Sequence, residues 1–174
     1  MAILSRDSWD TYFMKIARLV SERSPCLSKQ VGAVAVIDHA IIATGYNAPP
    51  RKVPHCEVCR RINTDDYTAG QGYDDCISVH AELNCVIQSA RLGITLEGST
   101  LYCTHFPCVY CLKALINAGI ETVVVEKFDI KESDIIEWGK YLKIRKPHNT
   151  EQFFDRDLIE SCVVDPKYKD DGGH

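Results

Sequence analysis

The sequence lacks any apolar run close to the roughly 18 residues that a membrane-spanning helix needs. Its first residues, MAILSRDSWDTYF, become polar too early to form the apolar segment of a signal peptide. It also lacks an excess of positive charge, because 24 acidic residues outnumber 20 Lys and Arg. Non-specific binding to nucleic acid depends on basic side chains. We therefore expect a cytoplasmic protein that acts on neither a membrane nor a nucleic-acid polymer.

Internal repeats and a clear domain boundary are also missing from the 174 residues. A chain of this length usually forms one domain. We expect that domain to span residues 1–165 and the polar end, residues 166–174, to form a flexible tail.

The hydrophobic pattern predicts alternating helices and strands. The predicted helices cover residues 7–23, 80–91, 108–118, 133–141 and 151–160, and the predicted strands cover 31–38, 40–46, 99–104 and 122–126. The dipeptide Asp38-His39 fits a tight turn between the first two strands. A long polar loop, residues 47–76, precedes the second helix and needs something to hold it in place. This order predicts an α/β protein, with a mixed sheet covered by helices on both faces.

Nine cysteines are many for a chain without a secretion signal. The odd number and the missing signal argue against a disulfide framework. Metal ligands, buried thiols and redox-active thiols remain, and only the spacing of the cysteines distinguishes them.

Two short motifs indicate a metal site: HAE at residues 80–82 and PCVYC at residues 107–111. Cys108 and Cys111 fall in the first turn of a predicted helix, where the helix dipole stabilises thiolates, and His80 begins another helix. A catalytic zinc takes three protein ligands and leaves one position for water. Alone, PCVYC could be a redox pair or two buried thiols, and HAE a helix cap. Together they match the H-x-E and P-C-x-x-C signature of zinc deaminases, in which the glutamate, here Glu82, transfers protons.

With these motifs, the chain resembles the cytidine deaminase superfamily and, within it, the deoxycytidylate (dCMP) deaminases. The resemblance spans about residues 6–129 and includes SPCLSKQVGAVAVID, GYNAPP, HAELN and INAGIETVVV. Ala48 replaces a usual glycine and Phe128 replaces a frequent tyrosine. The resemblance implies a three-layer αβα cytidine-deaminase-like fold with a mixed five-stranded sheet.

The resemblance also implies an activity: hydrolytic deamination of dCMP to dUMP and ammonia by a zinc-activated hydroxide, which supplies dUMP for thymidylate synthesis. One catalytic Zn²⁺ would be held by His80, Cys108 and Cys111, with Glu82 as the catalytic acid and base. Such enzymes form homo-oligomers, dimers or hexamers. They respond to dCTP and dTTP as effectors, and a bound nucleotide effector could bring Mg²⁺.

Several residues are candidates for binding the substrate. Asn47 could hold the sugar hydroxyl, although an asparagine here also fits a turn. The Ala81 N–H could bind the pyrimidine carbonyl. The remaining candidates are Thr104 and Phe106 for the pocket wall and Arg51 and Lys52 for the 5′-phosphate. Phe106 fits the core equally well, and the two basic residues fit a solvated loop.

A second group of cysteines indicates a structural zinc. The candidate ligands are Cys26, Cys56, Cys59 and Cys76, with His55 as a substitute. Some phage and bacterial dCMP deaminases carry such an extra zinc, which would hold the long loop. The alternative is a set of reduced thiols. Cys85, Cys103 and Cys162 are predicted core residues.

Other functions remain open at this point. Within the deaminases, the substrate could be dCTP, 5-modified dCMP, cytidine or guanine. The chain could also be a non-catalytic relative of the kind found in DNA-uptake competence operons. The presence of Glu82 favours catalysis, because a scaffold protein has no need of a proton-transferring carboxylate.

Overall fold

The computed structural model describes residues 6–59, 76–129 and 132–147. The elements, in chain order, are α1 (Trp9–Ser21), β1 (Gly32–Ile37), β2 (Ala40–Tyr46), α2 (Ala81–Leu92), β3 (Thr100–His105), α3 (Val109–Asn117), β4 (Thr122–Lys127), α4 (Glu132–Trp138) and β5 (Lys143–Arg145). They confirm the predicted order of elements as far as α4. The short strand β5 is the fifth strand of the sheet that the resemblance implied, although the hydrophobic pattern did not locate it. The predicted helix 151–160, the middle of the long loop and the tail 166–174 lie outside the described residues.

The five strands form one mixed sheet in the order β2-β1-β3-β4-β5. Strand β1 runs antiparallel to β2 and β3, whereas β3, β4 and β5 are parallel to one another. The turn between β1 and β2 is the predicted one: Asp38 and His39 have φ angles of 47° and 63°. Positive φ at both central residues is typical of a tight hairpin turn that matches the strand twist.

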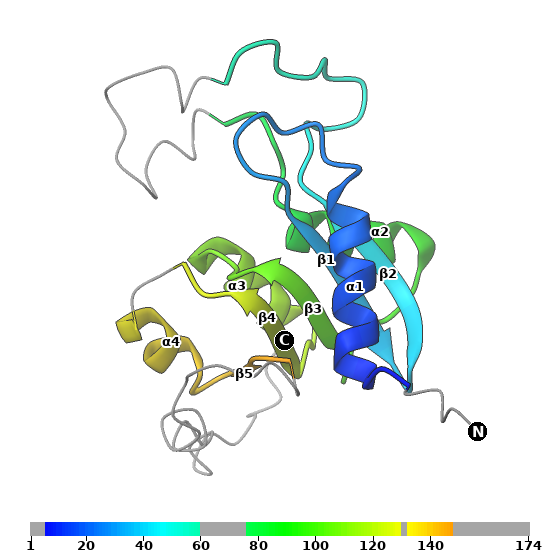
Figure 1. Ribbon diagram of the computed structural model, residues 1–174, viewed down its shortest axis with the longest axis vertical. Helices are drawn as coiled ribbons and strands as arrows, with labels where there is room; N and C mark the ends of the chain where they lie inside the picture. Colours follow the sequence, from blue (N-terminus) through cyan, green and yellow to red (C-terminus); the bar gives the residue numbers. More distant parts are fainter. Residues whose placement is uncertain (1–5, 60–75, 130–131, 148–174) are drawn as a thin grey trace, which may run out of the picture.

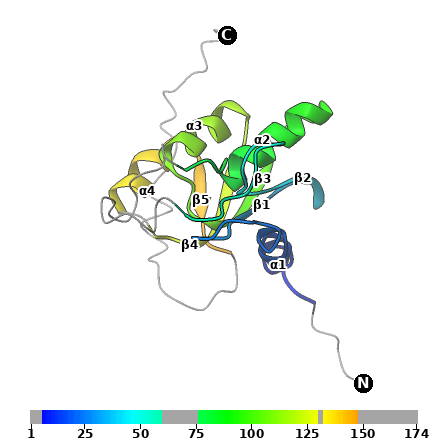
Figure 2. The ribbon, with the colours of Figure 1, turned by 90° about the horizontal axis from the view of Figure 1, so that it is seen from above.

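The helices lie on both faces of the sheet, so the protein has three layers (Figures 1 and 2). Helix α1 covers one face, and α2 and α3 cover the other (Figure 2). The strands supply both cores, because alternate side chains point to opposite faces. On β1, Ala33 and Ala35 belong to the core beneath α2 and α3, whereas Val34 and Val36 pack under α1. The αβα fold expected from the sequence is therefore confirmed.

Glycine allows α2 to lie directly on the edge strand β2. A Cβ atom added to Gly45 would overlap the carbonyl oxygen of Ala81 and lie 2.5 Å from the amide nitrogen of Cys85. Both are backbone atoms of α2, which cannot move aside as a flexible side chain can. The start of α2, which carries the HAE motif, is therefore fixed against the sheet by backbone contact.

In the part of the chain that the structure describes, no helix has the length and hydrophobicity that crossing a bilayer requires.

Candidate metal centre and active site

His80, Cys108 and Cys111 lie together, although 28 residues separate the first two in the sequence. Their potential ligand atoms all fall within 4.8 Å of one another. The Sγ atoms of Cys108 and Cys111 lie 3.4 Å and 3.5 Å from Nδ1 of His80. Over residues 6–59, 76–129 and 132–147, no other three His, Cys, Asp or Glu side chains come this close. The structure thus joins the two motifs into one candidate metal site.

Two helices begin at this site. His80 is the N-cap of α2 and Cys108 is the N-cap of α3, and neither side chain makes a capping hydrogen bond. An N-cap side chain usually accepts a bond from a free N–H of the first turn. Here these side chains point to each other instead, and the positive ends of both helix dipoles lie beside the sulfur atoms. The arrangement favours thiolates.

The two thiols differ in their protonation. The pKa of the Cys108 thiol is lowered to about 4, first by a hydrogen bond from Cys111 and also by His80, although burial acts in the opposite direction. The pKa of the Cys111 thiol is raised, first by its hydrogen bond to Cys108 and then by burial. One thiolate beside one thiol is the expected state of such a pair without a metal, because two adjacent negative charges repel each other.

The residues present fit zinc. Two sulfur atoms and one imidazole nitrogen are ligands that zinc prefers. Three protein ligands are typical of catalytic zinc sites, whereas structural sites use four. Glu82, a buried carboxyl group, lies next to the three ligands. A carboxylate in this place can act as the base that accepts a proton from a reacting water molecule.

Glu82 is the second residue of α2 and its side chain is almost entirely buried. Its Oε2 atom has no hydrogen-bond partner among the described residues. Burial is the main reason that the pKa of this carboxyl rises from 4.5 to about 7; the charges and hydrogen bonds of His80, Cys108 and Cys111 also act on it. A buried carboxyl with a pKa near neutrality is suited to accept and donate protons.

Asn47, the predicted sugar contact, is buried, and its side chain bonds to the main chain of the segment before β1. Its Oδ1 atom accepts a bond of 2.8 Å from the Val31 N–H, and its Nδ2 atom donates to the Lys29 carbonyl, also at 2.8 Å. The Ser24 hydroxyl lies 2.7 Å from both the main-chain oxygen and Oδ1 of Asn47. The residue therefore fastens the end of β2 to the segment before β1, in addition to any contact with a substrate.

The other candidates near the metal ligands are buried as well. Ala81, fully buried, is the first residue of α2 and lies between His80 and Glu82. Thr104 is buried, and its Oγ1 atom accepts a bond of 3.2 Å from the Gly32 N–H. Phe106 belongs to the core and packs against Phe128 at 5.6 Å between ring centroids, which agrees with its alternative assignment as a core residue.

The two candidates for the phosphate differ from these. Arg51 and Lys52 are exposed and lie in the turn after Pro50. The loop that follows β2 extends beyond the end of the sheet (Figure 1). Lys52 has a φ angle of 72°, which is unusual for a residue with a side chain. A role for either residue at the phosphate stays a prediction.

The second cysteine group is less compact than the first. Cys26, Cys56, Cys59 and Cys76 are each partly exposed, and together with His55 they include no three ligand atoms as close as those of the first site within the described residues. A structural zinc at these residues stays a prediction. Cys85 and Cys103 are buried, as predicted, and burial raises the pKa of the Cys85 thiol to about 12. Cys162 lies outside the described residues.

Two residues near the site were not identified from the sequence. Gly45 was part of a strand, and only the structure shows that a helix touches it. Asn84 follows Glu82 within the quoted HAELN motif, and its side chain reaches the end of β2. The sequence signal that could have identified Asn84 is its polar side chain at a position on the partly buried face of a helix.

Comparison with known proteins agrees with this geometry. A family model described as the cytidine and deoxycytidylate deaminase zinc-binding region matches residues 7–127. The chain is 40% identical over 126 residues to the deoxycytidylate deaminase of Saccharomyces cerevisiae. The aligned residues make up 71% of this chain and 39% of that protein. It is 39% identical over 122 residues to ComE operon protein 2 of Bacillus subtilis, and these residues make up 69% of this chain and 60% of that protein. The chain thus spans less than two thirds of the length of these relatives.

A solved structure gives the same result. The dCMP deaminase of the cyanophage S-TIM5, in complex with dCMP and dUMP, superposes with a TM-score of 0.66 at 28% identity, over 82% of this chain and 98% of that one. The region that the family model matches, residues 7–127, contains the His-Cys-Cys site and Glu82. The chain therefore belongs to the cytidine and deoxycytidylate deaminase family and carries its zinc-binding region.

Proposed function

We propose that the protein deaminates dCMP hydrolytically to dUMP and ammonia. The observation that carries this proposal is the buried Glu82, whose Oε2 atom has no partner among the described residues and stands beside His80, Cys108 and Cys111. A carboxyl in this position serves proton transfer rather than stability, because an unpaired buried polar atom costs free energy. The similarity to proteins named deoxycytidylate deaminase supports cytosine nucleotides as substrates.

His80, Cys108 and Cys111 would hold zinc through Nδ1 and the two Sγ atoms. When bound, zinc supplies a Lewis acid that lowers the pKa of water to near neutrality. Glu82 accepts a proton at Oε2 from the water that adds to C4 of cytosine and passes it to ring N3. Glu82 then transfers the second proton of the water, which the added hydroxyl still carries, to the departing amine. Water is consumed, ammonia leaves, and a uracil nucleotide remains.

The substrate would be held by main-chain and side-chain groups around this centre. The N–H of Ala81, at the start of α2, is suited to bind the pyrimidine carbonyl. The Asn47 amide has two hydrogens, one of which is given to Lys29, so the second is available for a sugar hydroxyl. Thr104 and Phe106 would support the pocket wall. Arg51 or Lys52 would pair with the 5′-phosphate.

The proposal extends to cofactors and partners. Cys26, Cys56, Cys59 and Cys76, with His55 as a substitute, would hold a second, structural zinc that orders the loop 47–76. The protein would act as a homo-oligomer, a dimer or hexamer, in the cytoplasm and supply dUMP for thymidylate synthesis. It would respond to dCTP and dTTP, with Mg²⁺ bound alongside the nucleotide effector.

Ammonia release from the purified protein tests the function. The substrates are dCMP, dCTP, 5-methyl-dCMP, deoxycytidine, cytidine and guanine, each with and without added dCTP or dTTP. We expect turnover of dCMP, increased by dCTP and reduced by dTTP. Turnover of only another compound would retain the zinc chemistry and contradict the assigned substrate.

A second candidate is the non-catalytic role considered from the sequence, because one relative is named ComE operon protein 2 and not for an enzymatic activity. The same assay distinguishes it: a protein that contains zinc and releases ammonia from none of these compounds would support the non-catalytic role.

A further inference from the structure

The side chain of Asn84 connects two segments that meet beside the metal ligands. Its Nδ2 atom donates to the Tyr46 carbonyl at 2.8 Å and to the Val79 carbonyl at 3.3 Å. Tyr46 is the last residue of β2, and Val79 immediately precedes His80. One amide group on α2 therefore contacts both the end of the edge strand and the entrance to the metal-binding helix.

The two segments are also joined to each other. Ala48 and Val79 form an isolated antiparallel bridge, with N–H to carbonyl distances of 3.1 Å and 2.8 Å. On the opposite side, Asn47 is bonded through its side chain to Lys29 and Val31. Residues 46–48 are thus held between Asn84 on one side and the segment before β1 on the other.

The Tyr46 carbonyl needs such a partner. Tyr46 stands opposite Gly32, one position from the hydrogen-bonded pair of Val31 and Asn47, so the main-chain groups of Tyr46 and Gly32 point away from each other. The Gly32 N–H accordingly donates to Thr104 Oγ1 on β3. Because β2 is an edge strand, no further strand of the described residues lies beside it to supply a donor. The Asn84 amide takes the place of a neighbouring strand.

The metal ligand His80 depends on Asn84 in a different way. The main-chain N–H of Asn84 donates to the His80 carbonyl at 2.9 Å, and any residue except proline at this position retains that bond. Helix α2 is also fixed to β2 through Gly45. Loss of the Asn84 side chain therefore removes the support of residues 46–48 on the α2 side while leaving the start of the helix, and the ligand on it, in place.

We infer that Asn84 is a positioning residue: it aligns residues 46–48, and with them the sugar-binding Asn47, with the metal centre. The inference rests on the proposed function, because it assumes that the nucleotide lies against this segment. Its consequence is a separation of effects, in which the side chain of Asn84 governs nucleotide binding and not metal binding.

Asn84→Ala and Asn84→Asp test the inference, with Gln88→Ala, an exposed position one turn later on α2, as the matched control. The measurements are zinc affinity by competition with a chromogenic chelator, kcat and KM for dCMP, and the melting temperature. Loss of two neutral hydrogen bonds should raise KM about tenfold in Asn84→Ala. Asn84→Asp should raise KM more, because it retains the shape but places an acceptor against two carbonyl oxygens. Zinc affinity, kcat and the control should stay within about threefold of wild type.

The other outcomes distinguish failure of this inference from failure of the proposed function. A wild-type KM in Asn84→Asp, or in Asn84→Ala, overturns the inference and leaves the proposed function intact. Weaker zinc binding in a folded variant also overturns it, since the side chain would then act on the metal helix. Absence of turnover in the wild-type protein overturns the proposed function itself, and the inference with it. If Asn84→Ala does not fold, Asn84→Asp, with the same side-chain shape, decides the result.

Discussion

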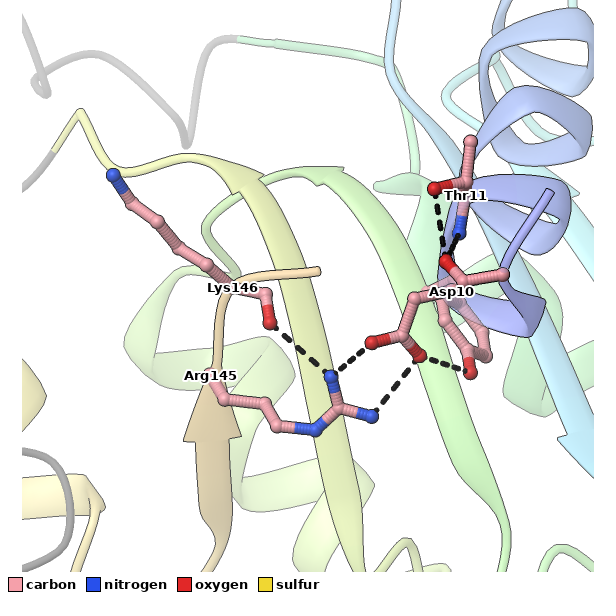
Figure 3. Close-up of polar contacts among 6 residues, drawn as sticks. Asp10, Thr11, Arg145 and Lys146 are labelled. Carbon is pink, nitrogen blue, oxygen red and sulfur yellow. Dashed lines mark hydrogen bonds and ion pairs between the residues drawn. The ribbon is translucent and has the colours of Figure 1, made fainter. Parts of the chain in front are cut away.

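Arg145 on β5 and Asp10 on α1 are 135 residues apart in the sequence and form a two-point ion pair (Figure 3). One guanidinium nitrogen donates to each carboxylate oxygen, and Nη1 also reaches the Lys146 carbonyl at 3.1 Å. The Tyr102 hydroxyl donates to the same carboxylate at 2.8 Å. The Asp10 side chain is only 6% exposed, so the carboxylate depends on these partners. The pair fastens the short strand β5 to α1, the helix that covers one face of the sheet.

Replacement of Arg145 should destabilise the protein. In Arg145→Leu the buried carboxylate of Asp10 loses its counter-charge, and we expect the free energy of unfolding to fall by about 2–3 kcal/mol, measured by urea denaturation. Lys143→Met is the control, because its pair with Glu121 is more than half exposed on both sides and should contribute less than about 1 kcal/mol. Asp10→Asn combined with Arg145→Leu should recover part of the loss. Equal stabilities of Arg145→Leu and the control would refute a structural role for the pair.

Replacement of Gly45 should separate α2 from the sheet. The Cβ of Gly45→Ala overlaps backbone atoms of Ala81 and Cys85, so the helix that carries His80 must shift. We expect a loss of stability of about 3 kcal/mol or more and weaker zinc binding, measured by denaturation and by metal analysis after dialysis. Gly98→Ala is the comparison: its φ of 71° is unfavourable for alanine, but nothing lies within 4 Å. It should cost about 1 kcal/mol and leave zinc bound. Normal zinc content in Gly45→Ala would contradict the argument.

Glu82→Gln should retain zinc and lose turnover. Glutamine has the shape of the buried side chain but cannot accept the proton from water, and general acid–base catalysis contributes about 10²–10⁴-fold to a rate. We expect kcat to fall at least 10³-fold on this basis, with unchanged metal content and an unchanged circular dichroism spectrum. Substantial ammonia release by this variant would remove Glu82 from the mechanism.

Glu82 also predicts a pH dependence in the metal-free protein. Burial raises its pKa from 4.5 to about 7, so between these values the folded state holds a proton that the unfolded state has released. Stability is therefore lost as the pH rises through this range. Relative to Glu82→Gln, the free energy of unfolding of metal-free wild type should fall by about 3 kcal/mol between about pH 4.5 and about pH 8. Parallel curves for the two proteins, in urea titrations with a chelator present, would contradict the assigned protonation.

The number of zinc ions tests the second cysteine group. If Cys26, Cys56, Cys59 and Cys76 hold a structural zinc, elemental analysis should find two zinc ions per chain. Cys56→Ser with Cys59→Ser should then retain one zinc and its dCMP turnover while losing thermal stability. Cys108→Ser with Cys111→Ser should lose the other zinc and all turnover. A single zinc ion in the wild-type protein would refute the structural site.

The local motifs alone predicted the candidate metal ligands and the candidate proton-transferring carboxylate. Cys108 and Cys111 are three residues apart at the start of a helix, a spacing that places both side chains on one face. His80 and Glu82 are two residues apart at the start of another helix, whereas the meeting of the two motifs, 28 positions apart, required the tertiary structure. The alternating core residues of β1 and the turn at Asp38 and His39 were predictable for the same reason, since both depend on a few neighbouring residues.

Only the tertiary structure decided which distant groups meet. Strand β5 has three residues, too few for a recognisable pattern, and its ion pair to Asp10 joins the two ends of the described chain. The contact of Gly45 with α2 and the two bonds of the Asn84 amide likewise depend on how a helix packs against an edge strand. A sequence pattern records which faces are apolar, but contacts between elements are set by packing, in which residues remote in the chain compete for the same space.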